Sequence, residues 1–178
     1  RREHMCTSNL EKIHDKFVTQ NTNDHVNDTF LVDVLLAAKE EAEDIKKKYK
    51  EIKDKNGLKD DQVTTCRAIK SSFADLGDII RGRDLWDRDN GSTEMEKHLI
   101  TIFGKIKELK GEDKYTNDTD ANPRYKKLRA DWWTANRRQV WKAMICETPS
   151  GKNPCSGTDV PLDDYIPQRL RWMTEWAE

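Results

Sequence analysis

Apolar residues recur every three or four positions along most of this chain, which is the spacing of one buried face of an α-helix. The longest run begins at Thr29 and ends at Asn56-Gly57, a pair suited to a helix C-terminal cap. No segment alternates apolar and polar residues over a useful length, so strands are not expected. The pattern therefore predicts an all-α domain. The longest apolar face consists of Leu31, Val34, Leu35, Ala38, Ala42, Ile45, Tyr49 and Ile52.

The same spacing predicts further helices on both sides of this run. A short helix is expected over Leu10, Ile13 and Phe17, before a polar stretch that ends at Asp28. Polar loops should separate the others. The later helices are expected from Asp60 or Asp61 to Gly82, from a capping sequence at Ser92-Thr93 through Ile106, from Pro123 to Cys146, and from Pro161 or Pro167 onward.

Composition limits the classes of protein to which the chain can belong. Charged residues make up 37% of the chain and hydrophobic residues 35%, a balance that can leave a chain disordered. Six tryptophans and the helical periodicity indicate that it folds. The net charge of -1 argues against a uniformly basic nucleic-acid binder. The best apolar run, Phe30 to Ala38, is interrupted by Asp33 and is too short to cross a membrane.

Neither the cysteines nor the histidines form a motif for metal binding or catalysis. The four cysteines, Cys6, Cys66, Cys146 and Cys155, include no Cys-x-x-Cys pair, so disulfides and buried thiols both remain open. Four cysteines allow three pairings. No zinc-protease motif or glycine-rich phosphate loop is present, and we expect no enzyme, no cofactor and no metal site.

The segment from Pro123 to Cys146 is strongly basic, with Asp131 as its single acidic residue. One interpretation is a docking face for a sulfated glycan or an acidic protein surface. The other is an ordinary solvated helix, balanced by acidic residues elsewhere in the chain. The basic residues are Arg124, Lys126, Lys127, Arg129, Arg137, Arg138 and Lys142.

The same helix carries the aromatic residues expected to build the core. Because adjacent helix positions lie about 100° apart, we expect only one of Trp132 and Trp133 to face the core. That ring should join Phe73 and Trp141 between the second long helix and this one.

Long stretches of the sequence resemble a known adhesion domain. They are Cys66 to Trp86, Asp131 to Cys146 and Pro161 to Glu178, together with Arg1 to Leu10 and Phe30 to Lys39. These stretches are similar to the Duffy-binding-like domain that is repeated in the erythrocyte membrane protein one family of Plasmodium falciparum.

The resemblance implies a disulfide-linked helical bundle of the Duffy-binding-like type, incomplete at both ends. Residues 1–160 would form the N-terminal and middle helical subdomains, and 161–178 the truncated start of the next. The stretch between Cys155 and Val160 looks shorter than in the family, as if residues were absent. The family pattern also implies a disulfide between Cys66 and Cys146, with Cys6 and Cys155 paired elsewhere.

The resemblance further implies a host-receptor-binding module on the extracellular face of the infected erythrocyte membrane, beside neighbouring domains of one long chain. Ser71 to Ile80 and the Trp86-Asp87 ending look like the zeta or epsilon types, some of which bind the Fc region of immunoglobulin M. Chondroitin sulfate binding through the basic helix and a structural spacer role are the alternatives. Arg137, Arg138 and Lys142 are the candidate ligand-binding residues.

Overall fold

The computed structural model describes residues 25–56, 62–85, 90–111, 113–119, 123–146, 153–155, 157 and 159–177. This part of the chain contains helices and connecting segments and no strand, so the all-α prediction is confirmed. The short helix expected near Leu10 lies outside the described residues. The elements are α3 (Val26–Asn56), α4 (Gln62–Ile80), α5 (Asn90–Lys110), η2 (Asp113–Asp118), α6 (Lys126–Met144), η3 (Asp163–Tyr165) and α7 (Gln168–Ala177).

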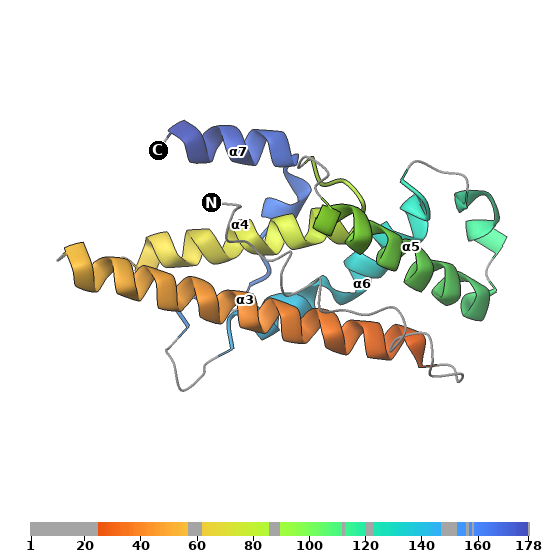
Figure 1. The fold of residues 1–178 in the computed structure, drawn as a ribbon, viewed down its shortest axis with the longest axis horizontal. Coiled ribbons are helices and arrows are strands. Elements are labelled where there is room, and N and C mark those ends of the chain that lie inside the picture. The colour runs from red at the N-terminus through yellow and green to blue at the C-terminus, as the bar shows by residue number, and fades with distance from the viewer. Residues whose placement is uncertain are drawn as a thin grey trace.

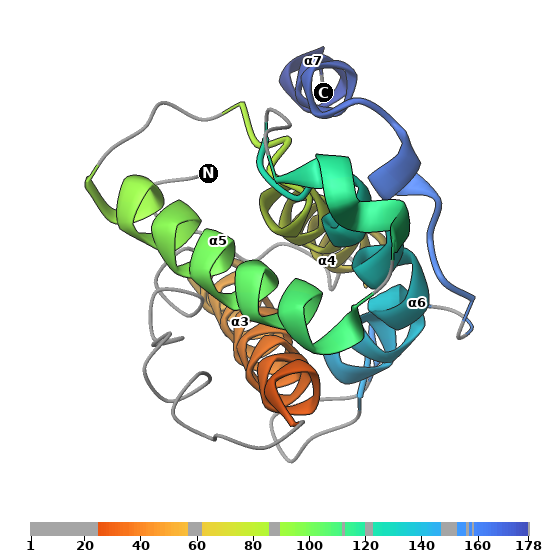
Figure 2. The same ribbon diagram turned by 90° about the vertical axis from the view of Figure 1, so that its right-hand side faces the viewer.

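The 31-residue helix α3 is the longest element, and it packs against α4, α5 and α6. α3 and α4 run antiparallel side by side in Figure 1, while α6 runs in the same direction as α3. Figure 2 shows α7 on the outer side of α4, away from α3. None of the helices in the described residues is apolar over a length that could cross a membrane.

Both adjacent tryptophans of α6 are buried, with exposed fractions of 4% for Trp132 and 1% for Trp133. The expectation that only one would face the core is wrong, because α6 is covered on two sides. Trp132 packs against Phe30 of α3, with ring centroids 4.8 Å apart, and Trp133 packs 5.3 Å from Phe73 of α4. Phe73 also meets Trp141 at 5.4 Å, as the sequence predicted.

Capping interactions determine where α4 ends and where α6 begins. Gly82 ends α4 with a left-handed φ of 67°, and the N–H groups of Gly82 and Arg83 donate to carbonyls of the last turn. Pro123 does not open α6. Instead, the carboxylate of Asp118 accepts hydrogen bonds from the backbone N–H groups of Lys127 and Leu128, at 3.0 and 2.8 Å.

The disulfide joins Cys66 to Cys155, not to Cys146, and the Cα atoms are 4.9 Å apart. The expected Cys66–Cys146 bond and the expected pairing of Cys155 elsewhere are both wrong. Cys146 is exposed at the end of α6, and its carbonyl accepts a hydrogen bond from Lys46 of α3. Cys155 is buried against the start of α4. Cys6 lies outside the described residues.

Candidate functional site

The three candidate ligand-binding residues of α6 do not form one surface. Arg138 and Lys142 are exposed and lie one helical turn apart, so they can meet a partner. Arg137 points to the interior side of the helix. Its guanidinium donates to both carboxylate oxygens of Asp164, at 2.9 and 2.7 Å, and to the carbonyl of Pro161.

Arg137 therefore attaches η3 to α6. The side chain of Asp164 is fully buried, and it also accepts a hydrogen bond from the indole N–H of Trp133 at 2.8 Å. Hydrogen bonding to Asp164 raises the pKa of Arg137, which keeps the pair charged. The guanidinium also lies 4.9 Å from the ring centroid of Tyr165. A residue held in this way supports the fold rather than an outside ligand.

A second cation of the basic segment, Arg129, is also internal and has no exposed surface. It pairs with both carboxylate oxygens of Glu96 on α5, at 2.7 and 2.9 Å. Its remaining N–H groups donate to the carbonyls of Ile80 and Ile79, at 2.6 and 3.0 Å. The side chain thus satisfies the carbonyl end of α4 and joins three helices.

A charged cluster fixes α7 to α4. Arg171 donates to the carboxylates of Asp75 and Asp78, at 2.6 and 2.8 Å. Arg81 pairs with Asp78 at 3.0 Å and donates to the carbonyl of Asp164 at 2.8 Å. Gln168 donates to Asp75 and to Asp84. Sequence reasoning gave none of these long-range partners.

Burial and charge act in opposite directions on this cluster. Burial raises the pKa of Asp78 above its usual value, although bonding to Arg171 and attraction to Arg81 lower it. Burial also lowers the pKa of Arg81. For Arg171, burial tends to lower the pKa, but the bonds to Asp78 and Asp75 outweigh burial and raise it. The carboxylates and guanidinium groups of this cluster therefore stay charged in the interior only while each has its oppositely charged partner.

Arg81 stabilises the C-terminal end of α4, because its Nε donates to the carbonyl of Gly77 at 2.8 Å and the side chain is buried. Arg83 is exposed just beyond the helix.

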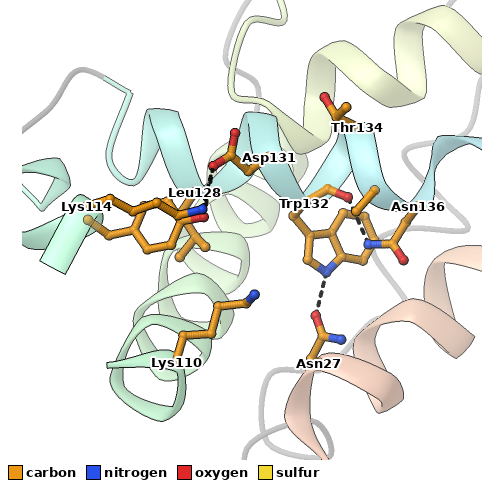
Figure 3. A pocket seen from close by; sticks show the side chains of 10 residues that line it. Asn27, Lys110, Lys114, Leu128, Asp131, Trp132, Thr134 and Asn136 are labelled. Atoms are coloured by element: carbon orange, nitrogen blue, oxygen red, sulfur yellow. Dashed lines mark hydrogen bonds and ion pairs between the residues drawn. The ribbon is translucent and has the colours of Figure 1, made fainter. Parts of the chain in front are cut away.

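An open groove of ≈ 530 Å³ lies where α6 meets the start of α3, the end of α5 and η2 (Figure 3). Trp132, Leu128, Ala135 and Tyr115 contribute apolar surface to its lining. The polar residues that line it are Asn27, Lys110, Lys114, Asp131, Thr134 and Asn136.

Hydrogen bonds between elements hold the walls of this groove. The indole N–H of Trp132 donates to Asn27 at 2.8 Å, which joins α6 to α3. The hydroxyl of Tyr115 donates to Asp131 at 2.9 Å, which joins η2 to α6. Burial raises the pKa of Tyr115, so its hydroxyl stays a donor at neutral pH.

A second pocket, also ≈ 530 Å³, lies beside the disulfide. Its lining comes from the start of α4, including Arg67 and Lys70, from the segment around Pro154 and from Asp163 of η3. Within the described ranges, no three His, Cys, Asp or Glu side chains are placed to hold a metal ion.

Comparison with known proteins identifies the family of this chain. A family model described as the Duffy binding domain matches residues 1–171. A solved PfEMP1 DBLbeta domain bound to ICAM-1 is 53% identical, with a TM-score of 0.83, and the match covers 100% of this chain and 43% of that one. A second DBLb domain of PfEMP1, bound to human ICAM-1, is 49% identical with a TM-score of 0.80, over 99% of this chain and 39% of that one.

Curated relatives give the same family at lower identity. The Duffy receptor gamma form of Plasmodium knowlesi is 33% identical over 115 residues, which are 63% of this chain and 9% of that protein. The chain thus spans less than half of the solved domains and about a tenth of this relative. The matched domains bind receptors rather than catalyse reactions, as expected from the sequence. This chain belongs to the Duffy binding domain family.

Proposed function

We propose that the chain is part of a host-receptor-binding domain of the PfEMP1 type, and that the complete domain binds ICAM-1. The observation that carries this proposal is the 53% identity, over the whole chain, to a DBLbeta domain bound to ICAM-1. A second domain of the same type, at 49% identity, is bound to human ICAM-1. The whole protein would display the domain on the surface of the infected erythrocyte, beside its other domains.

The described residues supply a rigid part of such a domain. We propose that 1–160 belong to the N-terminal and middle helical subdomains and that 161–178 begin the next one. The C-terminal segment is fixed to α4 and α6 by Arg171 and Arg137, yet its outer side is apolar. We propose that the remainder of the domain covers this side, because the chain accounts for 43% of the solved domain. Its exposed apolar residues are Leu162, Tyr165, Ile166, Leu170 and Met173.

Surface plasmon resonance with the complete domain tests the proposal. We expect saturable binding to the extracellular part of ICAM-1, and no comparable binding to immunoglobulin M or to chondroitin sulfate. Binding should be lost when the domain is unfolded by reduction and alkylation. A folded domain that does not bind ICAM-1 at micromolar concentration would exclude this function.

Binding to the Fc region of immunoglobulin M by a zeta- or epsilon-type domain is the second candidate. It rests on the likeness of Ser71 to Ile80 to those types. In the structure every residue of this stretch is buried in α4, so it forms scaffold rather than a contact surface. The resemblance of this stretch is thus stronger evidence for the family than for binding to immunoglobulin M.

Fewer cations of the basic helix are available to bind a glycan than the sequence suggested. Arg129 and Arg137 are engaged inside the fold, which leaves exposed cations at the two ends of the segment: Arg124, Lys126 and Lys127 at the start, and Arg138 and Lys142 near the C-terminal end of α6. Binding through such exposed cations would weaken steeply with salt, because exposed ionic contacts are screened over a Debye length of ~8 Å at physiological ionic strength. A spacer would bind none of the three partners.

A further inference from the structure

The disulfide between Cys66 and Cys155 borders an open pocket. Both cysteines line the pocket of ≈ 530 Å³ at the start of α4. The two differ in exposure, because Cys155 is buried, with an exposed fraction of 6%, whereas Cys66 is half-buried. A small solute that enters the pocket therefore has better access to the sulfur of Cys66 than to that of Cys155.

Three charged side chains line the same pocket, and they are placed differently relative to Cys66. Lys70 follows Cys66 by one turn of α4, so the two side chains are neighbours on one side of the helix. Arg67 lies about 100° further around the helix and is already engaged within the protein. Asp163 comes from η3. The helix thus places the Lys70 ammonium, rather than the Arg67 guanidinium, beside Cys66.

The Lys70 ammonium is available to a solute in the pocket. Within the residues that the structure describes, it takes part in no hydrogen bond or ion pair. A thiolate opens a disulfide by attacking one sulfur and displacing the other, and access to the attacked sulfur affects the rate. A cation beside that sulfur attracts the anionic attacking group, most strongly at low ionic strength.

We propose that the Cys66–Cys155 disulfide is a redox-sensitive link, opened from this pocket by small thiols that carry a carboxylate. The attacking thiolate forms a bond to the sulfur of Cys66 while the bond to Cys155 breaks. Cys155 leaves as a thiolate and takes a proton from solvent. A second thiol then displaces the first from Cys66, so two small thiols are oxidised to one disulfide as the protein disulfide is reduced.

The link is one of several attachments between α4 and the C-terminal part of the chain. Arg171 binds Asp75 of α4, and Arg137 of α6 binds Asp164 of η3. Reduction removes the covalent attachment at Cys155 and leaves these charged contacts in place. The proposal does not depend on which receptor the domain binds, so its test can succeed or fail independently of the receptor-binding experiment.

Reduction kinetics of the complete domain at low ionic strength test the proposal. The probes are 3-mercaptopropionate, whose thiolate form carries two negative charges, and cysteamine, whose thiolate form is neutral overall. Samples are quenched with iodoacetamide, and mass spectrometry locates the mixed disulfide. We expect a rate that rises linearly with the concentration of either thiol, and a mixed disulfide on Cys66. A mixed disulfide on Cys155 instead, or a rate that levels off because the domain must first unfold, would overturn the proposal.

Two identical substitutions separate the effect of Lys70 from that of surface charge in general. Lys70→Gln should slow the reaction with 3-mercaptopropionate about threefold and leave the reaction with cysteamine unchanged. Lys39→Gln, at an exposed position of α3 outside the pocket, should change neither rate. An unchanged rate of 3-mercaptopropionate with the Lys70→Gln domain would exclude the role of Lys70. Equal slowing with both thiols would exclude it as well.

Discussion

At the scale of single residues, arginines that the sequence places among solvated charges are part of the interior. Arg129, Arg137 and Arg171 each bind a carboxylate of a distant segment and at least one backbone carbonyl. The planar guanidinium, with five N–H donors, can satisfy several acceptors at once, which an ammonium group cannot. Arginine thus joins helices in a chain whose hydrophobic content is modest.

Reversing the charge of Arg137 should lower the free energy of unfolding far more than reversing the charge of its neighbour Arg138. Arg137→Glu places a second carboxylate against the buried Asp164, and we expect a loss of ~3–5 kcal/mol in the free energy of unfolding. Arg138→Glu, at an exposed position of the same helix, should change it by less than ~0.5 kcal/mol. Urea unfolding of the complete domain measures both. Similar losses from the two substitutions would contradict the internal role of Arg137.

Removing Arg171 should leave a buried charge without its main partner. Arg171→Met deprives Asp75 and Asp78 of their shared guanidinium, and we expect a loss of ~3–5 kcal/mol at pH 7. Arg169→Met, on the exposed side of the same helix, should be nearly neutral.

The loss in the Arg171→Met variant should depend on pH in a defined direction. Burial already raises the pKa of Asp78, and the pKa rises further without Arg171. Below this raised pKa and above the usual carboxyl pKa, the native state binds more protons than the unfolded state, so stability grows as pH falls. The difference between variant and unmodified domain should narrow from pH 7 to pH 5. A difference that stays constant over this range would exclude Asp78 as the group left unpaired.

At the scale of elements, α4 and α6 approach closely because α4 carries a glycine at the contact. A Cβ atom at Gly77 would lie 2.7 Å from two ring atoms of Trp133. Trp133 cannot move away, since its N–H is bonded to Asp164 and its ring packs on Phe73. The pairing of these helices thus depends on one small residue and one large one.

Gly77→Ala should therefore destabilise the domain although alanine favours helices. We expect a net loss of ~1–3 kcal/mol from overpacking, measured by thermal or urea unfolding. Gly104→Ala on α5 is the matched control. Its Cβ would lie 3.1 Å from the hydroxyl oxygen of Tyr125 and at least 3.6 Å from the ring carbons, so it should cost less than Gly77→Ala. A Gly77→Ala domain as stable as the unmodified one would show that the two helices can separate without cost.

The sequence predicted the positions of the helices better than the long-range contacts between them. The apolar period placed the long helix and its end at Asn56, and Gly82 gave the end of α4 correctly. These signals are local, because caps and periodicity act within a few residues. The start of α6 was misplaced because Asp118, which caps it, comes from a separate turn. The internal role of Arg137 was missed for the same reason, because its partner Asp164 lies 27 residues away in the sequence.

At the scale of the whole molecule, the disulfide connects the start of α4 to the segment that follows α6, 89 residues later. Cys146 and Cys155 both follow α6, so sequence position alone does not distinguish them as partners of Cys66. The partner of Cys66 depends on which helix each of these two cysteines lies against. The end of α6 at Cys146 contacts α3 through Lys46, whereas Cys155 returns to α4.

Loss of this bond should destabilise the domain as a unit. In the chain-entropy model, opening a loop of this size gives the unfolded state ~4–5 kcal/mol of additional conformational freedom. Cys66→Ser and Cys155→Ser should each produce this loss, and the double variant should lose no more than either single one, because both remove the same bond. Cys146→Ser should have a smaller effect, since that residue takes no part in the bond. Peptide mapping without reduction checks the connectivity directly, and a fragment containing Cys66 linked to Cys146 would contradict it.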